Sequence, residues 1–268
     1  MQTSGAPHDT RPAFDNSRIL DAVHLFTTPE RRDRSPRDAE LIAAATPLVA
    51  GPGLSALAWG EGPIVLLVHG WSGLGLQMRA FVAPLLAVGY RVVMLDGPAH
   101  GASEGTHTNP LHYAGALLGA AASLGPLDGV IAHSMGAAST AIALDRGLDA
   151  RRVVLISGPS SLEGAMERFA AAYGLDADDT VRFKSILAGK AGAHSRDLAV
   201  AVVAPRLHTP ALIVHDPDDD EVPYAEAQDI VAAWPGARLY TTRDAGHRRM
   251  LRDSGVVAEA VAFVSAAD

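Results

Sequence analysis

The sequence predicts an α/β fold: a doubly wound, mostly parallel sheet of eight strands with helices on both faces. Short apolar segments alternate with longer segments of helical spacing along most of the chain, the pattern of parallel strands joined by helices. Four of the apolar segments are hydrophobic at nearly every position, as expected for strands buried on both faces. The 268 residues, 48% of them hydrophobic, are enough to bury one large core.

The elements follow from apolar runs bounded by turn residues and from helical spacing. The expected strands are 48–50, 54–59, 64–68, 91–95, 129–132, 153–156, 211–214 and 238–241. The expected helices between them are 76–88, 111–124, 135–146, 224–234 and 256–265.

Residues 1–46 are expected to form N-terminal helices or an arm that packs on the main domain. Segments 18–26 and 36–45 show helical spacing, and the charged stretch 29–37 separates them. The alternative is that they help to cover the mouth of the active site. The first residues, about 15 of them, mix charges with Pro, Gly and Ser, so we expect poor order there and no secretory signal.

One connection, residues 158–209, is too long for a single crossover helix. It contains three amphipathic pieces, 162–173, 181–187 and 198–203. An unstructured loop of this length is unusual in a compact domain. We therefore expect residues 159–209 to form a small helical cap, or lid, inserted after the sixth strand. Residues 47–158 and 210–268 would form the core.

Composition excludes several classes of function. The net charge of −8, from 22 basic and 30 acidic residues, argues against binding to nucleic acid or to an anionic membrane. No apolar run reaches the roughly 18 residues of a membrane span. The absence of cysteine excludes disulfides, thiolate catalysis and cysteine zinc sites. We expect a soluble cytoplasmic enzyme that acts on a small molecule, without a metal or a cofactor; the sequence makes no prediction of oligomeric state.

A serine lies where a predicted strand meets a predicted helix, in the sequence Ala132-His133-Ser134-Met135-Gly136. A tight turn at such a junction exposes the hydroxyl with the helix N-terminus behind it, which is how a serine nucleophile is presented. The usual pattern is G-x-S-x-G, and Ala132 replaces its first glycine. Ser134 could instead be a simple helix N-cap, but two downstream segments favour catalysis.

These two segments supply an acid and a base in order. An acidic loop follows the expected strand 211–214, and Gly246-His247 follows the last strand. The order Ser, Asp, His is that of α/β-hydrolase triads and differs from those of chymotrypsin and subtilisin. Residues 47–268 thus resemble the α/β-hydrolase superfamily through five motifs in order. They are His69-Gly70-Trp71, Asp96 to Ser103, Ala132 to Gly136, His215 to Pro223 and Gly246-His247.

The resemblance implies that Ser134 is the nucleophile and His247 the general base, since an imidazole can take and return a proton at neutral pH. The superfamily pattern H-G-x-x-D-x-x-V-P, aligned on His215, makes Asp219 the triad acid that orients the imidazole. Asp218 is the alternative acid. Asp216 stands at the glycine of this pattern, and most carboxylates of the loop are expected to be solvated.

The same resemblance places the oxyanion hole at the backbone N–H groups of Trp71 and Met135. The Trp71 ring could also form a wall of the substrate pocket. The turn from Asp96 to Ser103 and the histidines at strand ends are expected to be structural. Three aromatic residues of the expected cap are candidates to line a modest apolar acyl pocket for short to medium chains. They are Phe169, Tyr173 and Phe183.

A serine at this position disfavours haloalkane dehalogenase and epoxide hydrolase chemistry, which use aspartate there, and the lack of cysteine excludes dienelactone hydrolysis. We therefore expect a hydrolase that cleaves a small or medium carboxylic ester through an acyl-enzyme. Lactone, thioester, amide or C–C hydrolysis and perhydrolysis would use the same residues. A binding protein with a vestigial triad and an acyltransferase are further alternatives.

Overall fold

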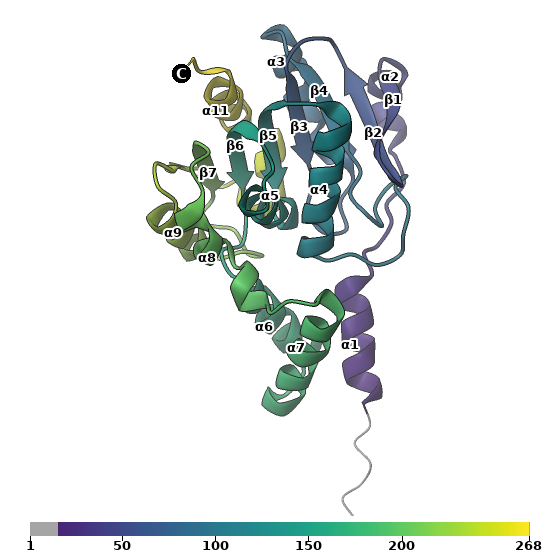
Figure 1. The fold of residues 1–268 in the computed structure, drawn as a ribbon, viewed down its shortest axis with the longest axis vertical. Helices are drawn as coiled ribbons and strands as arrows, with labels where there is room; N and C mark the ends of the chain where they lie inside the picture. The colour runs from purple at the N-terminus through teal and green to yellow at the C-terminus, as the bar shows by residue number, and fades with distance from the viewer. Residues whose placement is uncertain (1–15, 268) are drawn as a thin grey trace, which may run out of the picture.

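The eight expected strands form a single sheet (Figure 1). The computed structural model describes residues 16–267, so the expectation of poor order in the first residues lies outside the described range. The strands are β1 (Thr46–Gly51), β2 (Leu54–Trp59), β3 (Ile64–Val68), β4 (Arg91–Leu95), β5 (Leu127–His133), β6 (Ala150–Ile156), β7 (Ala211–His215) and β8 (Arg238–Thr241).

The sheet has the order β1-β2-β4-β3-β5-β6-β7-β8. β2 is antiparallel to both of its neighbours, and every other pair is parallel. In the centre, Leu66 of β3 is in register with Val93 of β4 and Val130 of β5. The predicted doubly wound, mostly parallel sheet is confirmed, and β3 and β5 lie beside each other at its centre.

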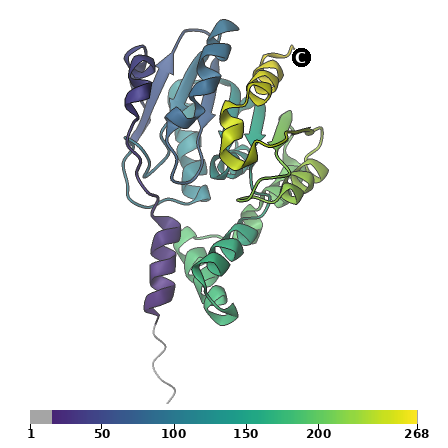
Figure 2. The ribbon, with the colours of Figure 1, turned by 180° about the vertical axis from the view of Figure 1, so that it is seen from behind.

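Helices cover both faces of the sheet (Figures 1 and 2). They are α1 (Ser17–Thr27), α2 (Ala39–Ala43), α3 (Val82–Ala87), α4 (Pro110–Leu124), α5 (Met135–Asp145), α6 (Leu162–Tyr173), α7 (Ala177–Ala191), α8 (Val200–Val203), α9 (Tyr224–Ala233), α10 (Gly246–Arg249) and α11 (Ser254–Ser265). In the described part of the chain, no helix has the length and apolar character needed to cross a membrane.

The helix expected over 76–88 is divided. Gly75–Phe81 forms a 3₁₀ helix, and only Val82–Ala87 is α-helical. Pro84 has no N–H to donate to the carbonyl four residues earlier, and the Gly75 N–H donates to Asp96 Oδ1 (2.9 Å). The missing N–H of Pro84 interrupts the α-helical ladder, so Pro84 lies in the first turn of the shorter helix. The bond from Gly75 ties the start of the 3₁₀ helix to Asp96.

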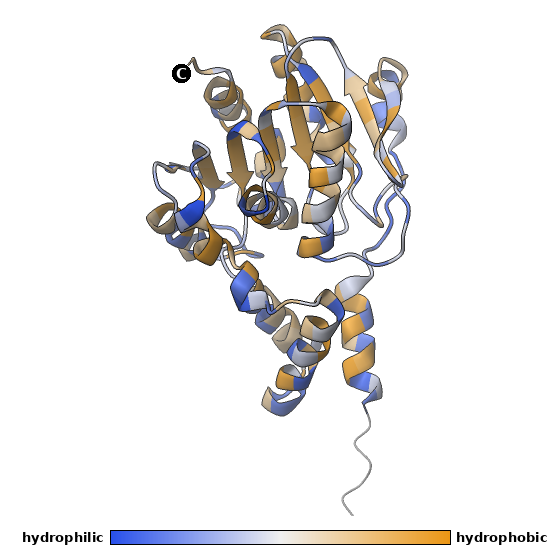
Figure 3. Ribbon diagram, in the orientation of Figure 1, coloured by the Kyte–Doolittle hydropathy of each residue, from blue (hydrophilic) through white to orange (hydrophobic). Residues whose placement is uncertain are grey.

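An apolar layer covers each face of the sheet, and the central strands are among the most hydrophobic segments of the chain (Figure 3). Successive residues of a strand point to opposite faces. Leu66 and Val130 accordingly join the layer that includes α4 and α5, whereas Leu67 and Ile131 join the layer with α3 and α11. Burial on both faces explains why these strands are apolar at consecutive positions.

The insertion between β6 and β7 is helical, and its helices α6 and α7 stand with α1 beyond the end of the sheet (Figures 1 and 2). Its second helix, α7, begins earlier than the spacing predicted because Asp176 caps it, accepting a hydrogen bond from the Asp179 N–H (2.8 Å). Ile19 of α1 and Phe183 of α7 share a separate small core. Helices α6 and α7 thus pack on the N-terminal helix, whereas α8 packs on the main core beside α5 and α9.

The charged segment after α1 runs back along the core. Arg31 donates hydrogen bonds to the carbonyl oxygens of Gly101 (2.5 Å), Ser103 and Gly105 (both 2.7 Å). These contacts fix the segment against the turn that follows β4. The segment is therefore held near the carboxyl ends of the central strands.

Candidate active site

Ser134 occupies a sharp turn between β5 and α5. Its backbone has φ 53° and ψ −123°, a conformation that is strained for a residue with a side chain and typical of a nucleophile elbow. The turn needs glycine two residues later, because a Cβ on Gly136 would lie 2.4 Å from the His69 carbonyl oxygen. The strain and the close packing leave the Ser134 side chain partly exposed in the adjacent cavity.

Asp219 and His247 form a buried pair. His247 Nδ1 lies 2.8 Å from Asp219 Oδ2 and 3.1 Å from Oδ1. Since a carboxylate can only accept, Nδ1 carries the proton and Nε2 is left with its lone pair. Burial raises the pKa of Asp219, but hydrogen bonds from His247 and from the N–H groups of Val222 and Glu221 outweigh it and lower the pKa to about 2. The carboxylate is therefore ionised at neutral pH.

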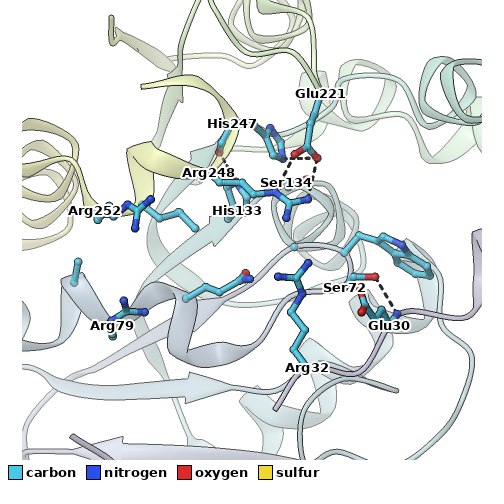
Figure 4. Close-up of a pocket in the computed structure, with 15 residues that line it drawn as sticks. Glu30, Arg32, Ser72, Arg79, His133, Ser134, Glu221, His247, Arg248 and Arg252 are labelled. Atoms are coloured by element: carbon cyan, nitrogen blue, oxygen red, sulfur yellow. Dashed lines mark hydrogen bonds and ion pairs between the residues drawn. The ribbon is translucent and has the colours of Figure 1, made fainter. Parts of the chain in front are cut away.

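The edge of the His247 ring that carries Nε2 borders the cavity. Nε2 is 3.6 Å from Glu221 Oε2, and within the described residues it makes no hydrogen bond to Ser134 Oγ. His133 Nε2 donates to the His247 carbonyl oxygen (2.9 Å), which ties the histidine loop to the residue before the serine. Figure 4 shows Ser134 and His247 on the same side of the cavity, with Glu221 beside them.

Asp216 is fully buried and holds the two loops of the pair together. Its carboxylate accepts hydrogen bonds from Thr242 Oγ1 (2.7 Å) and from the N–H groups of Ala245 (2.7 Å) and Asp218 (2.8 Å). Asp218 and Asp220 are exposed. The expectation of solvated carboxylates thus holds for these two. It is wrong for Asp216, because groups of its own loop and of the loop before His247 donate hydrogen bonds to it.

The expected oxyanion donors lie at the same turn. A Cβ on Gly70 would come within 2.8 Å of Ser134 Cβ, so the segment leading to Trp71 passes directly beside the serine. Met135 begins α5, where the helix dipole favours negative charge. Within the described chain neither the Trp71 N–H nor the Met135 N–H donates a hydrogen bond. Both N–H groups remain available to a ligand.

Two buried histidines fix the turn that carries Trp71. His69 Nε2 accepts from the Gly97 N–H (2.9 Å), and His100 Nε2 accepts from the Ser72 N–H (3.0 Å). Burial lowers the pKa of each histidine to about 4. Both rings are therefore neutral acceptors at neutral pH.

The turn after β4 has the structural role that was expected. Asp96 accepts from the N–H groups of Gly75 and Ala102, and Ser103 Oγ donates to the Asp96 carbonyl oxygen (2.6 Å). Together with His100, this turn supports the segment that carries Trp71.

A cavity of about 590 Å³ opens in front of Ser134 and His247. Its wall includes Trp71, as expected, but most of its other side chains are polar or charged. They are Glu30, Arg32, Ser72, Gln77, Arg79, Glu221, Arg248 and Arg252, with Ala80 and Leu251 as apolar members. The predicted apolar acyl pocket is therefore not what the structure has.

Phe169, Tyr173 and Phe183 do not line this cavity. Phe169 stacks against Tyr173 and Phe183, and Phe26 of α1 meets Phe169 and Phe183 edge to face. A short helical insertion needs an apolar core of its own, and these rings provide it. No residue of 159–209 borders the cavity; Glu30 and Arg32 of the charged segment border it instead. The N-terminal arm thus packs on the core, as through Arg31 and the Leu41 carbonyl oxygen, and it also borders the site.

Sequence reasoning missed the charged residues of the wall. Two sequence signals could have pointed to them. Glu221 lies two residues beyond Asp219, and the stretch 29–37, which contains Glu30 and Arg32, is rich in charged residues. Arg79 and Arg252 gave no signal. No cluster of three or more His, Asp or Glu side chains suited to a metal ion occurs among residues 16–267.

Comparison with known proteins identifies the family. No curated protein matches the chain in sequence. Among solved structures, Rv0554 from Mycobacterium tuberculosis superposes with a TM-score of 0.63 at 18% identity, over 84% of this chain and 99% of the other. An esterase from Exiguobacterium antarcticum gives 0.63 at 18%, over 82% and 99%.

A meta-cleavage product hydrolase from Pseudomonas fluorescens gives a TM-score of 0.60 at 17% identity, over 81% of this chain and 96% of the other. At these identities the likeness shows the fold alone. The sequence model of the alpha/beta hydrolase family matches residues 65–260, well over half of the chain. The chain therefore belongs to the alpha/beta hydrolase family.

Proposed function

We propose that the protein is a serine hydrolase that cleaves a small or medium carboxylic ester through an acyl-enzyme. The observation that carries the proposal is the buried Asp219–His247 pair, 2.8 Å apart, whose free Nε2 faces the cavity that also exposes Ser134. The strained turn at Ser134 and the two unengaged N–H groups beside it support the same reading. Ser134, Asp219 and His247 are the proposed nucleophile, acid and base.

In the first half of the reaction, Ser134 Oγ attacks the carbonyl carbon of the ester while its proton passes to His247 Nε2. The Trp71 and Met135 N–H groups stabilise the negative oxygen of the tetrahedral intermediate. The C–O bond to the alcohol then breaks, and His247 returns the proton to the leaving oxygen. Asp219 stabilises the imidazolium while it exists.

In the second half, water takes the place of the alcohol. His247 accepts a proton from the water as its oxygen attacks the acyl carbon, and Ser134 leaves with that proton restored. The product is a carboxylic acid. Hydrogen bonds of a catalytic serine are often long without substrate, and here Nε2 must turn from Glu221 toward Ser134 as the substrate binds.

An ester is the first substrate class to test because it is the commonest outcome of this set of groups. The solved structures of similar fold include one titled an esterase and one titled a meta-cleavage product hydrolase, so the fold leaves C–C hydrolysis open. The cavity volume of about 590 Å³ supports a small or medium substrate, being within the usual range of small-molecule sites.

The test is hydrolysis of p-nitrophenyl acetate, butyrate and octanoate by wild type, Ser134→Ala and the control Ser123→Ala, an exposed serine on α4. We expect kcat to fall at least about a thousandfold in Ser134→Ala and to be unchanged in Ser123→Ala. We also expect acetate and butyrate to be cleaved faster than octanoate. Activity that survives in a folded Ser134→Ala protein would contradict the proposal.

A further inference from the structure

More cationic than anionic side chains line the cavity in front of Ser134, in a protein that is negatively charged overall. Four arginines and two glutamates line it, whereas the chain carries a net charge of −8. The four arginines come from segments far apart in the sequence, namely the arm after α1, the 3₁₀ helix after β3 and the region of α10. A cleft lined by an excess of one charge concentrates ligands of the opposite charge.

Two of these arginines have no ion pair within the described chain. Arg79 pairs with Asp38 (3.3 Å) and Arg248 with Glu221 (2.9 Å). Neither Arg32 nor Arg252 has a carboxylate partner or a hydrogen-bond acceptor among the described residues, although each guanidinium presents five donors. Arg32 and Arg252 are therefore free to bind an anion in the cavity.

One carboxylate of the cavity wall, that of Glu221, is already bound by an arginine. Arg248 donates to both oxygens of Glu221, at 2.9 Å to Oε1 and 3.5 Å to Oε2, and Oε2 also lies 3.6 Å from His247 Nε2. Figure 4 shows Arg32 and Arg248 reaching into the same hollow below Ser134, with Arg79 and Arg252 on its other side. All four cations are arginine rather than lysine, and the planar guanidinium matches a carboxylate in two-point contacts. A planar anion is the ligand that such a set of guanidinium groups suits.

We propose that the substrate ester carries a second, negatively charged group such as a carboxylate, which the unpaired Arg32 and Arg252 attract into the cavity from its two sides while Ser134 attacks the ester. The proposal rests on the proposed function and names its substrate class. The anionic group could belong to the acyl or to the alcohol part of the ester. Either source requires the same pair of arginines.

The test compares charged and neutral esters. On the acyl side, the p-nitrophenyl monoester of glutaric acid is compared with p-nitrophenyl pentanoate, in which a methyl group replaces the carboxylate. On the alcohol side, para-butanoyloxybenzoate is compared with para-butanoyloxybenzamide. Each pair is assayed with wild type, the double variant Arg32→Gln/Arg252→Gln and the control Arg146→Gln, an exposed arginine outside the cavity.

The readout is the ratio of kcat/KM for the charged ester to that for its neutral partner, because a general loss of folding or catalysis lowers both. We expect this ratio to fall about tenfold or more in the double variant for at least one pair and to stay constant in Arg146→Gln. The pair that responds identifies the side that carries the charge. Raising NaCl from about 50 mM to about 500 mM should also lower the wild-type ratio, because salt screens exposed charges. Ratios that are equal in wild type and the double variant for both pairs would overturn the proposal.

If wild type cleaves none of the four esters, the proposed function fails and the anion site is tested by binding. Calorimetry would then compare para-butanoyloxybenzoate and the benzamide on Ser134→Ala protein with and without the two arginine substitutions. Tighter binding of the benzoate that is lost with the two arginines would support the site. Equal binding of both compounds would overturn it.

Discussion

Gly70 lies against Ser134 so closely that a Cβ at position 70 would stand 2.8 Å from the serine Cβ. Real Cβ atoms essentially never approach this closely, so any side chain at 70 must push the turn of Trp71 away from the serine. This contact links two ends of neighbouring central strands, β3 and β5. It sets the distance between the proposed nucleophile and one of its proposed oxyanion donors.

Gly70→Ala should therefore lower kcat about 10- to 100-fold on a neutral ester, with KM changed much less, since an oxyanion donor acts mainly in the transition state. Steady-state kinetics would show this. Gly115→Ala is a matched control because nothing lies within 4 Å of its added Cβ. A Gly70→Ala protein with full activity would separate Trp71 from the oxyanion hole.

Asp219→Asn should reduce kcat by about three to four orders of magnitude. The amide would no longer favour the His247 tautomer that leaves Nε2 as the base, and it would not stabilise the imidazolium. The exposed neighbour Asp220 offers the control Asp220→Asn, which should keep wild-type kinetics. If Asp218→Asn, and not Asp219→Asn, abolished activity, the acid would be misassigned.

Asp216→Asn should destabilise the fold by about 1–3 kcal/mol, because an amide cannot accept at both ends and leaves buried donors unsatisfied. The single amide oxygen can replace only one carboxylate oxygen, so either the Asp218 N–H, or Thr242 Oγ1 and the Ala245 N–H, loses its acceptor. Urea denaturation at neutral pH measures the change in the free energy of unfolding. Equal stability of Asp216→Asn and wild type would mean that this carboxylate does not hold the two loops together.

Stability should fall as the pH is lowered from about 7 to 5. Burial lowers the pKa of His69 and His100 to about 4 and that of His133 to about 3, from an ordinary value of about 6.5. In this window the unfolded chain binds protons at these positions and the folded protein does not. Acid therefore favours unfolding.

Each histidine contributes a slope of up to about 1.4 kcal/mol per pH unit. The free energy of unfolding from urea titrations at several pH values would reveal the decline. The slope should be shallower in His133→Gln, whatever the absolute stability of that variant. A wild-type stability that is constant between pH 7 and 5, or a variant slope equal to the wild-type slope, would contradict the neutral, buried state of these rings.

The sheet could be predicted because each strand has a local sequence pattern that indicates it. Val65 to Val68 is apolar at each position, which only burial on both faces explains. The positions of Ser134, Asp219 and His247 could be predicted because each follows a strand in a recognisable motif, and parallel strands bring their carboxyl ends together. Asp176 shows how a single capping residue shifts a helix start that apolar spacing alone places too late.

The lining of the cavity could not be predicted in the same way. Arg32, Arg79 and Arg252 belong to three separate segments, and only the packing of the arm on the core brings them to one hollow. Phe169 and Phe183 were misplaced because an aromatic residue on an amphipathic helix can line a pocket or fill a core. Which of the two occurs depends on α1, a partner that lies far away in the sequence.

The central claim, that Ser134 is the nucleophile, is tested most directly by trapping it. Purified wild-type protein would be treated with an alkyl fluorophosphonate and examined by intact-mass and peptide mass spectrometry. The account predicts a single phosphonyl adduct on Ser134, absent from folded Ser134→Ala protein and strongly slowed in His247→Ala. A folded wild-type protein that gains no adduct, or one whose adduct persists in Ser134→Ala, would contradict it.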